Sequence, residues 1–562
     1  MPPYELGVRV QDCPRLPLPL PHREEAPPSR PRNVRQIYVG NADTLLRKLA
    51  SPGEPLKSFE FGKMAALLHA ARETGLLEAF SRFCPRSLFD GYSVQHLLFF
   101  QLAARVEKTL SREAMAEWLD ESALSLLLPA TGPPSPRTLR RYLKRLYGAG
   151  EGEKRGEGFL SRSVTHRIES HVFQTLLKKG LEPRWMLFDT TNFFADHQGG
   201  RLMKRAKSKQ KRRDKLHAGL GLVTLGNLPT LSEVYPANEG DAKVFARVFD
   251  TLVKRLVDLE VATEKLVMVF DRGINSKENL EKVTEAMHVI ASLNRQQAQK
   301  LYQIPLQRYE GVVPGAKGGP VRGFPSRWNG FGQDWRVLVT YREGTAEREA
   351  KTWEEIRNRV LTKAEGWRKE PAHKEKALWR RLSELVPKPY QTEFEVSVET
   401  VKLQRKGKEV PGYLPVVRVN AQAEARLRAS FGKTAIITDL PKEEVSDAEV
   451  VEGFVARSAV EDDFRWLKDR YVVSVKPFWV WHDATVAGHT FLCVMGLLLL
   501  RYLQWELRKD PVTMKELVEG LERIRVVLVR TPEGKPRLVL EKMGRKEAQL
   551  FSRLNLAQFI PA

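Results

Sequence analysis

Three acidic side chains lie in contexts suited to chemistry on phosphate esters. Asp189 interrupts an apolar, strand-like run, and Asp271 directly follows another such run. Glu461 lies in a later segment between two cations, Arg457 and Lys468. Carboxylate oxygens shared with phosphate suit Mg²⁺ or Mn²⁺, and a pair of such ions can activate a water or hydroxyl and stabilise the leaving oxygen. The three acids therefore indicate a metal-dependent enzyme that cuts nucleic acid.

The segment around Glu461 places its polar residues on one side of a predicted helix. At about 100° per residue, Phe454, Arg457, Glu461 and Lys468 fall within roughly a 60° arc. A charged stripe is usually a solvated helix face, and the apolar residues on the opposite side suit a packed face. The aromatic ring at position 454 and the particular spacings argue instead for a site that holds a metal beside phosphates.

Each aspartate, taken singly, also has a simpler explanation. An acid at the C-terminal end of a strand lies at the mouth of an α/β sheet, where ligands bind. Burying a bare carboxylate is costly, so such an acid needs a cation or a metal as its partner. A salt bridge would satisfy Asp189, and a turn before Gly273 would account for Asp271. Neither position is diagnostic without the other two acids.

The composition limits the partners of the chain. Its 562 residues include 92 Lys+Arg and 69 Asp+Glu, and the net charge of +23 attracts polyanions. The longest apolar run, 491–500, is too short to cross a bilayer, so we expect a buried helix and no membrane partner. Three scattered cysteines and no secretory signal indicate a cytosolic protein. The glycine-rich stretch 315–320 misses the P-loop spacing, so we expect no nucleotide cofactor.

The N-terminal quarter predicts an arm followed by helices. Residues 1–37 are rich in proline and arginine, which indicates a flexible arm, and helical spacing covers 38–160. Ser135 before Pro136 predicts the start of a helix. Either a helix-turn-helix DNA reader or a basic, solvated helix on a bundle explains its cations, which are Arg137, Arg140, Arg141 and Lys144.

Residues 161–298 predict the first part of a mixed α/β layer, to which both aspartates belong. Two helices are expected at 241–258 and 276–286. The expected strands are 184–194, 217–224, 229–235, 265–270 and 288–293.

Residues 299–432 interrupt this layer. They predict an insertion domain with a charged helix at 345–385 and strands at 392–403 and 413–419. The layer resumes over 433–505, where Ser446 starts the helix that carries Glu461. Residues 506–562 then form a tail, with a predicted helix at 513–524 and a hairpin at 526–540.

A dense run of cations at 201–215 falls in the loop between the first two strands. Cations there would contact backbone phosphates without reading sequence, and they are Lys204, Arg205, Lys207, Lys209, Lys211, Arg212 and Arg213. Trp328 and Trp335, each beside an arginine, could stack on an unpaired base, although such tryptophans are more often part of a small-domain core.

These motifs together resemble a known family. An aspartate in a strand, Asp-Arg-Gly after a later strand and aromatic-x₂-Arg-x₃-Glu-x₆-Lys on a late helix resemble the DDE transposases of bacterial insertion sequences. The nearest subgroup carries a Tyr-Arg-Glu-Lys signature and a strand-rich insertion before the glutamate. The likeness covers about 184–505. The family tyrosine is Phe454 here, so the ring is retained while the hydroxyl and its phosphate contact are lost.

The resemblance implies an RNase H-like catalytic domain with a mixed β-sheet, interrupted by the insertion, and an N-terminal helical DNA-binding domain. Asp189, Asp271 and Glu461 would form the catalytic triad and hold Mg²⁺ or Mn²⁺. The transposon end would be held by Phe454, Arg457 and Lys468.

The expected activity is cleavage of insertion-sequence ends and transfer of the 3′-hydroxyl to target DNA. The partners would be terminal inverted repeats and target DNA, bound by a homodimer in the bacterial cytoplasm, at the nucleoid. Two alternatives remain: an inactive, transposase-derived repressor, and an RNase H-like nuclease or resolvase. Retention of all three acids favours the enzyme over the repressor.

Overall fold

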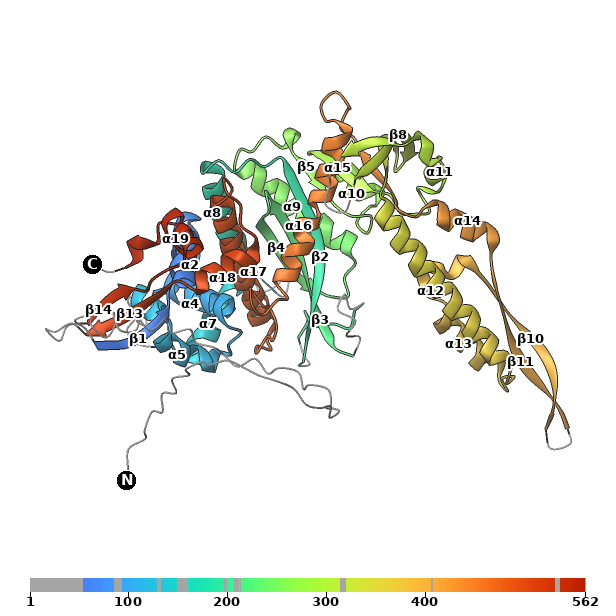
Figure 1. Ribbon diagram of the computed structural model, residues 1–562, viewed down its shortest axis with the longest axis horizontal. Helices are drawn as coiled ribbons and strands as arrows, with labels where there is room; N and C mark the ends of the chain where they lie inside the picture. Colours follow the sequence, from blue (N-terminus) through green and yellow to red (C-terminus); the bar gives the residue numbers. More distant parts are fainter. Residues whose placement is uncertain are drawn as a thin grey trace, which may run out of the picture. The chain divides into compact units, whose positions relative to one another are not determined.

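The computed structural model describes residues 54–84, 93–128, 133–148, 160, 162–196, 200–206, 212, 214–313, 320–405, 408–530 and 536–560 (Figure 1). The chain divides into two units, 1–54 with 530–535 and 55–529 with 536–562, and the second contains almost all of the described residues. The predicted arm 1–37 and the cations Lys207, Lys209, Lys211 and Arg213 lie outside the described residues.

A nine-stranded mixed sheet carries both aspartates. Its strand order is β4-β3-β2-β5-β6-β12-β9-β8-β7 (Figure 1). Strands β2, β3 and β4 pair antiparallel, whereas β2, β5 and β6 run parallel. The bounds are β2 Trp185–Ala195, β3 Leu216–Leu225, β4 Leu228–Pro236, β5 Val267–Val269, β6 His288–Ser292, β7 Glu310–Val313, β8 Val321–Gly330, β9 Gln333–Tyr341 and β12 Lys433–Thr438. The predicted order of three strands, helix, strand, helix and strand is confirmed.

Helix α9 (Asp241–Asp258) packs on one face of this sheet, and α10 (Lys277–Thr284) contacts both α9 and β6. Phe245 of α9 contacts Phe188 of β2 and Phe270, with ring centroids 5.1 and 4.9 Å apart. Successive side chains of a strand point to opposite faces. Because Phe188 faces α9, Asp189 faces the other side of the sheet.

The N-terminal helices share one hydrophobic core with the sheet. They pack around α17 (Asp483–Glu506), which contacts α2, α4, α7 and β4. Leu139, Leu143 and Leu146 of the basic helix are buried, and Ser135 caps its start as predicted. The bounds are α2 Gly62–Glu73, α3 Leu76–Phe83, α4 Val94–Glu107, α5 Arg112–Glu121, α6 Leu124–Leu127, α7 Pro136–Leu146 and α8 Ser163–Lys178.

Within the described part of the chain, α17 alone is long and apolar enough to cross a membrane by length and composition. Its most apolar stretch has a mean hydropathy of 1.6, and 94% of that stretch is buried inside the protein. A helix enclosed by protein on all sides needs no lipid to cover its apolar surface. The prediction that residues 491–500 form a buried helix is therefore confirmed.

The insertion has a smaller core of its own. Trp353 and Val360 of α12 (Glu343–Arg368) pack with Leu378 and Leu382 of α13 (Glu375–Leu385) against a two-stranded ribbon. The ribbon consists of β10 (Phe394–Arg405) and β11 (Lys408–Val419), and α14 (Ala421–Ala429) follows. Strands β7 to β9 belong to the central sheet, so the separately packed part begins at α12, whereas we predicted an insertion from 299. The expected single charged helix is two helices.

The C-terminal part forms α18 (Met514–Glu522), β13 (Arg525–Arg530), β14 (Pro536–Leu540) and α19 (Arg545–Arg553). The two strands join β1 (Glu54–Glu60) in a three-stranded sheet of order β1-β13-β14. The strand pair predicted at 526–540 is present, and its turn lies outside the described residues. The short helix α11 spans Gln299–Tyr302.

Candidate active site

The two aspartates lie on neighbouring parallel strands of the sheet. Leu187 of β2 lies opposite Val269, the last residue of β5, and each aspartate follows its member of this pair by two residues. Val269 also lies opposite Ile290 of β6, and Ser292, two residues further on, donates a hydrogen bond to Asp271. Asp189 thus lies within β2, whereas Asp271 and Ser292 meet where β5 and β6 end.

Asp271 is held by three donors. Its Oδ1 accepts hydrogen bonds from the Arg272 amide at 2.8 Å and the Ser292 hydroxyl at 3.1 Å. Its Oδ2 lies 3.2 Å from Nη1 of Arg457. Burial acts to raise the pKa of Asp271, but the Arg457 charge and the two hydrogen bonds outweigh it, so this pKa is lowered. Asp271 is therefore a carboxylate at neutral pH.

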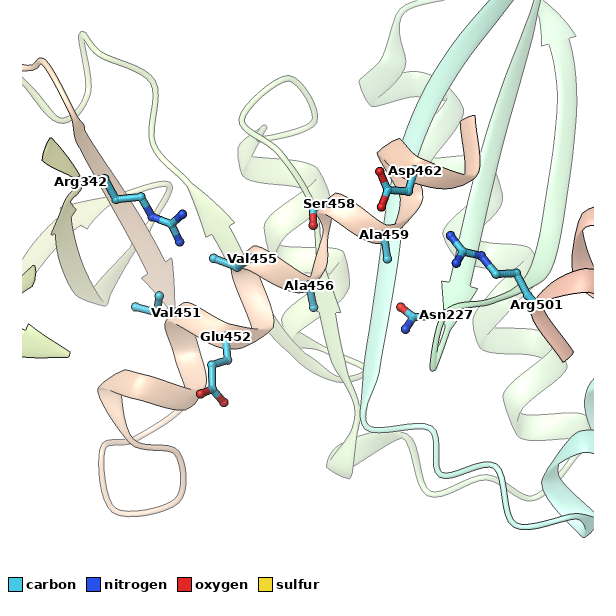
Figure 2. A pocket seen from close by; sticks show the side chains of 10 residues that line it. All are labelled: Asn227, Arg342, Val451, Glu452, Val455, Ala456, Ser458, Ala459, Asp462 and Arg501. Atoms are coloured by element: carbon cyan, nitrogen blue, oxygen red, sulfur yellow. The ribbon is translucent and has the colours of Figure 1, made fainter. Parts of the chain in front are cut away.

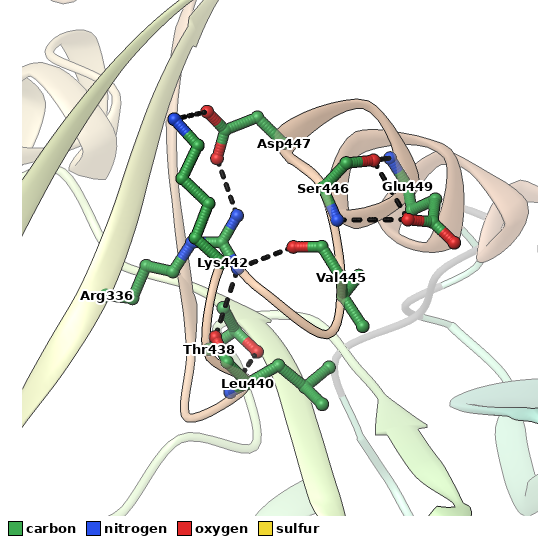
Figure 3. A network of polar contacts seen from close by, with 8 residues as sticks. All are labelled: Arg336, Thr438, Leu440, Lys442, Val445, Ser446, Asp447 and Glu449. Carbon is green, nitrogen blue, oxygen red and sulfur yellow. Dashed lines mark hydrogen bonds and ion pairs between the residues drawn. The ribbon is translucent and has the colours of Figure 1, made fainter.

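Helix α15 (Asp447–Ala456), which leads to Glu461, is fixed at its start. Ser446 and Glu449 form a capping box, so Ser446 starts the helix as predicted. Arg336 of β9 lies 2.6 Å from Oδ1 of Asp447 and also donates to two carbonyl oxygens of the preceding loop (Figure 3). Lys442 lies 3.6 Å from the other oxygen of Asp447. These contacts tie the helix start to the sheet edge.

Arg457 lies between Asp271 and Glu461. Its Nη2 is 3.6 Å from Oε1 of Glu461, so one guanidinium group contacts both acids. The expected single helix is broken at Arg457, after which α16 (Ser458–Trp466) carries Glu461. The Arg457 guanidinium also covers the Phe454 ring, with 5.2 Å to the centroid. The predicted grouping of Phe454, Arg457 and Glu461 on one side is present.

Lys468 joins the end of this segment to β2. Its ammonium group donates to the Thr191 hydroxyl at 2.7 Å and lies 5.6 Å from the Phe193 ring centroid. Thr191 is two residues beyond Asp189, so both face the same side of the sheet. An open pocket of about 560 Å³ runs along Glu461, Lys468 and the exposed Tyr471.

Asp189, Asp271 and Glu461 are all carboxylates, the ligands that hard divalent cations such as Mg²⁺ prefer. In the described residues, however, no group of three or more His, Cys, Asp or Glu side chains is arranged to hold a metal ion. The Arg457 guanidinium instead contacts two of the three acids, Asp271 and Glu461.

The other predicted DNA contacts have different outcomes. Trp335 is fully buried, and its indole N–H donates to the Gly330 carbonyl at 2.9 Å, so the predicted base stacking by Trp335 is wrong. A ring inside the core has no free face for a base. Trp328 is half-buried against Phe331. Stacking by Trp328 stays a prediction.

The described cations of the basic helix and loop differ in their exposure and partners. Arg140 pairs with Glu113 at 2.8 Å, whereas Arg137 and Lys144 are exposed. Arg141 is half-buried. In the loop before β3, Lys204 is half-buried, Arg205 is exposed, and Arg212 pairs with Asp214 at 2.7 Å. Their binding to DNA stays a prediction.

Sequence reasoning missed three hydroxyl groups around the acids. Ser292 donates to Asp271, Thr191 accepts from Lys468, and Thr190 donates to Asp241 at 2.8 Å. The register of the parallel strands would have placed Ser292. Val269 lies opposite Ile290, and Asp271 and Ser292 each lie two residues further along the chain. No comparable signal marks Thr191, whose partner is 277 positions away.

No curated protein sequence matches the chain. Among solved structures, a piggyBac transposase in a synaptic complex with hairpin DNA shares 8% sequence identity at a TM-score of 0.35, over 88% of this chain and 85% of that chain. No assignment rests on that likeness. The family model described as "Transposase DDE domain" matches residues 181–473, just over half of the chain and all three acids. The chain therefore belongs to the transposase DDE domain family.

Proposed function

We propose that the protein is a DNA transposase that cleaves insertion-sequence ends and joins the 3′-hydroxyl to target DNA by metal-dependent phosphoryl transfer. One observation carries the proposal: Asp189 and Asp271 each lie two residues beyond a residue pair of the parallel strands β2 and β5, and Arg457 connects Asp271 to Glu461. Membership of the transposase family makes DNA the polyanion that the net charge of +23 attracts. The sheet order β4-β3-β2-β5-β6 supports an RNase H-like classification.

Each residue has a role in this proposal. Asp189, Asp271 and Glu461 hold Mg²⁺ or Mn²⁺, which when bound would activate the attacking oxygen and stabilise the leaving one. Arg457 leaves the two carboxylates and contacts a phosphate, for which its planar group is suited. Lys468, already at the pocket edge, neutralises a second phosphate.

We also propose the Tyr-Arg-Glu-Lys subgroup of bacterial insertion sequences, from the spacing that Arg457, Glu461 and Lys468 share with it. Phe454 supports Arg457 through its ring and donates no hydrogen bond. A homodimer on two transposon ends in the bacterial cytoplasm would fit this assignment, because strand transfer requires both ends together. The oligomeric state on DNA is measurable by mass photometry.

The test compares two site variants with a neighbouring control. Asp189→Asn and Glu461→Gln should bind end DNA like the wild type and lose more than about 10³-fold in cleavage, because each removes a proposed cation ligand. Asp462→Asn is the control, since Asp462 is next to Glu461 but lines a different pocket (Figure 2). It should cleave normally.

The readout is single-turnover cleavage of DNA carrying the terminal repeats that flank the gene, in Mg²⁺. Cleavage by Asp189→Asn or Glu461→Gln would contradict the proposal. Cleavage without joining to target DNA would indicate a nuclease, and binding without cleavage by the wild type would indicate a repressor.

The basic loop is tested through its salt dependence. Each cation that neutralises a phosphate adds about one unit to the slope of log affinity against log salt. Replacing Lys204 and Arg205 by alanine should lower that slope by about two units and leave the cleavage rate of bound DNA unchanged. An unchanged slope would show that these two side chains do not contact DNA.

A further inference from the structure

A buried ion pair lies behind the helix that carries Glu461. Nε and Nη2 of Arg501, on α17, lie 2.7 and 2.6 Å from the same oxygen, Oδ1 of Asp463, on α16. The Asp463 side chain is 0% exposed and that of Arg501 is 13% exposed. Arg501 also donates to Gln504 at 3.0 Å, which fixes the plane of its guanidinium. Figure 2 shows the Arg501 side chain reaching toward α16 from α17.

Asp463 and Glu461 point to opposite sides of one short helix. Two residues of a helix are about 200° apart around its axis, so the side chain that meets α17 faces away from the one that meets Arg457. Helix α16 has nine residues and meets α15 at Arg457, where the backbone stays helical but the regular helix is interrupted. The rotation of α16 decides whether Glu461 faces Asp271.

Burial alone does not explain the pair. The neighbours on α16, Val460, Phe464 and Leu467, are buried and apolar, so an apolar pair would pack in the same place. Replacing a buried ion pair by apolar side chains is often neutral or stabilising, because desolvation of two charges offsets their attraction. The charged pair restricts how α16 can be oriented against α17, because two hydrogen bonds to one oxygen allow few orientations.

We propose that Asp463 and Arg501 are a positioning pair that sets the rotation of α16, so that Glu461 reaches the strand acids. This inference rests on the proposed function. On the site side, α16 is held by Arg457–Asp271 and Lys468–Thr191, and both contacts involve groups that the substrate phosphates would engage. The pair on the core side remains when those contacts are given up. It therefore keeps Glu461 in place during the reaction.

The test separates position from stability. The double variant Asp463→Leu with Arg501→Met should keep the thermal midpoint of the wild type or raise it, because no charge remains buried. End binding should stay within about twofold, while the cleavage rate of bound DNA falls about 10²-fold, the size of effect that a misplaced catalytic group produces. Arg501→Lys keeps a charge partner for Asp463 but lacks the planar fork that donates twice to one oxygen, so it should recover only part of the cleavage rate.

A matched control is the buried pair of Glu169 and Arg255, 2.9 Å apart and 2% and 3% exposed, which contacts β4 away from the acids. Glu169→Leu with Arg255→Met should leave the cleavage rate of folded protein unchanged. An equal loss in this control, or wild-type cleavage by the Asp463/Arg501 double variant, would overturn the inference. Both outcomes leave the proposed function standing.

Hydrogen exchange gives a readout that needs no cleavage. Amides 460–468 should exchange about tenfold faster in the Asp463/Arg501 double variant, while those of 447–456 are unchanged. If the wild type fails to cut DNA, the proposed function fails. If exchange at 460–468 is then also unchanged, the positioning pair is refuted independently.

Discussion

Two arginines lie on opposite sides of helix α16 and pair with acids in different ways. Arg457, on the site side, lies 3.2 and 3.6 Å from two carboxylates that are 43% and 57% exposed. Arg501, on the core side, lies 2.6 Å from a carboxylate that is fully buried. The Arg457 side chain is itself 17% exposed, so water reaches its ion pairs mainly through the carboxylates. Ion pairs that water screens contribute about 0–1 kcal/mol, whereas a buried charge that loses its partner is costly.

The difference separates exchangeable contacts from fixed ones. Arg457 can leave Asp271 and Glu461 for a phosphate at little cost, because water and the substrate replace what it loses. Arg501 has no such replacement inside the core. A helix that carries a catalytic acid needs contacts of both kinds. Those on the site side are given up to the substrate, and those on the core side keep the helix in place.

The largest expected effect compares the two arginines directly. Arg501→Met should lower the free energy of unfolding by about 3–5 kcal/mol, because Asp463 is left buried without a cation. Arg457→Met should lower it by less than about 1 kcal/mol. Urea denaturation of both variants measures the difference. Equal losses of unfolding free energy in the two variants would contradict the distinction between a fixed core side and an exchangeable site side of α16.

The next effect concerns the fixed donor on the site side. Ser292→Ala removes a hydroxyl that donates to Asp271, a bond contributing about 0.5–1.5 kcal/mol, so cleavage should fall about threefold to tenfold. Ser232→Ala is the control, because its hydroxyl donates to Glu169 at 2.7 Å, outside the site. It should lose similar stability and no cleavage. Wild-type cleavage by Ser292→Ala would show that the Arg272 amide and Arg457 suffice to orient Asp271.

Much of this site could be predicted from the sequence because its residues follow local patterns. Asp189 within an apolar strand and Asp271 after another require only alternation and turn chemistry to be placed. The spacing from Arg457 to Glu461 is one helical turn, which survives the helix break as an ion pair. Local periodicity therefore identified the acids and their neighbouring cation.

The remaining features depend on long-range packing. Asp463 reads as one more charge in Glu461-Asp462-Asp463, and only the fold shows that it is the buried member of the three. The burial of Trp335 also depends on the fold, because a tryptophan beside an arginine gives the same sequence pattern in a core and on a surface. The strands β8 and β9 looked like part of an insertion, because nothing local reveals that β9 pairs with β12.

A smaller effect tests whether Arg457 competes with a divalent cation. Arg457→Gln frees Asp271 and Glu461 from their shared cation, so Mn²⁺ affinity without DNA should rise up to about fivefold, the equivalent of an exposed ion pair. Arg501→Lys should leave it unchanged. Titration followed by electron paramagnetic resonance measures both. Weaker Mn²⁺ binding by Arg457→Gln would show that the arginine assembles the acids instead of holding them from the cation.

The smallest effect comes from Arg465, which lies within α16 itself. Arg465 pairs with Asp462 at 3.1 Å within one helical turn, and both side chains are exposed, so Arg465→Gln should change the free energy of unfolding by less than about 0.5 kcal/mol. Arg465 also lines the pocket beside Lys468. If a DNA strand enters there, the salt slope of end binding should fall by about one unit. An unchanged slope would place the DNA along Arg457 and Lys468 only. The exposed pair of Arg465 and Asp462 would then take no part in DNA binding.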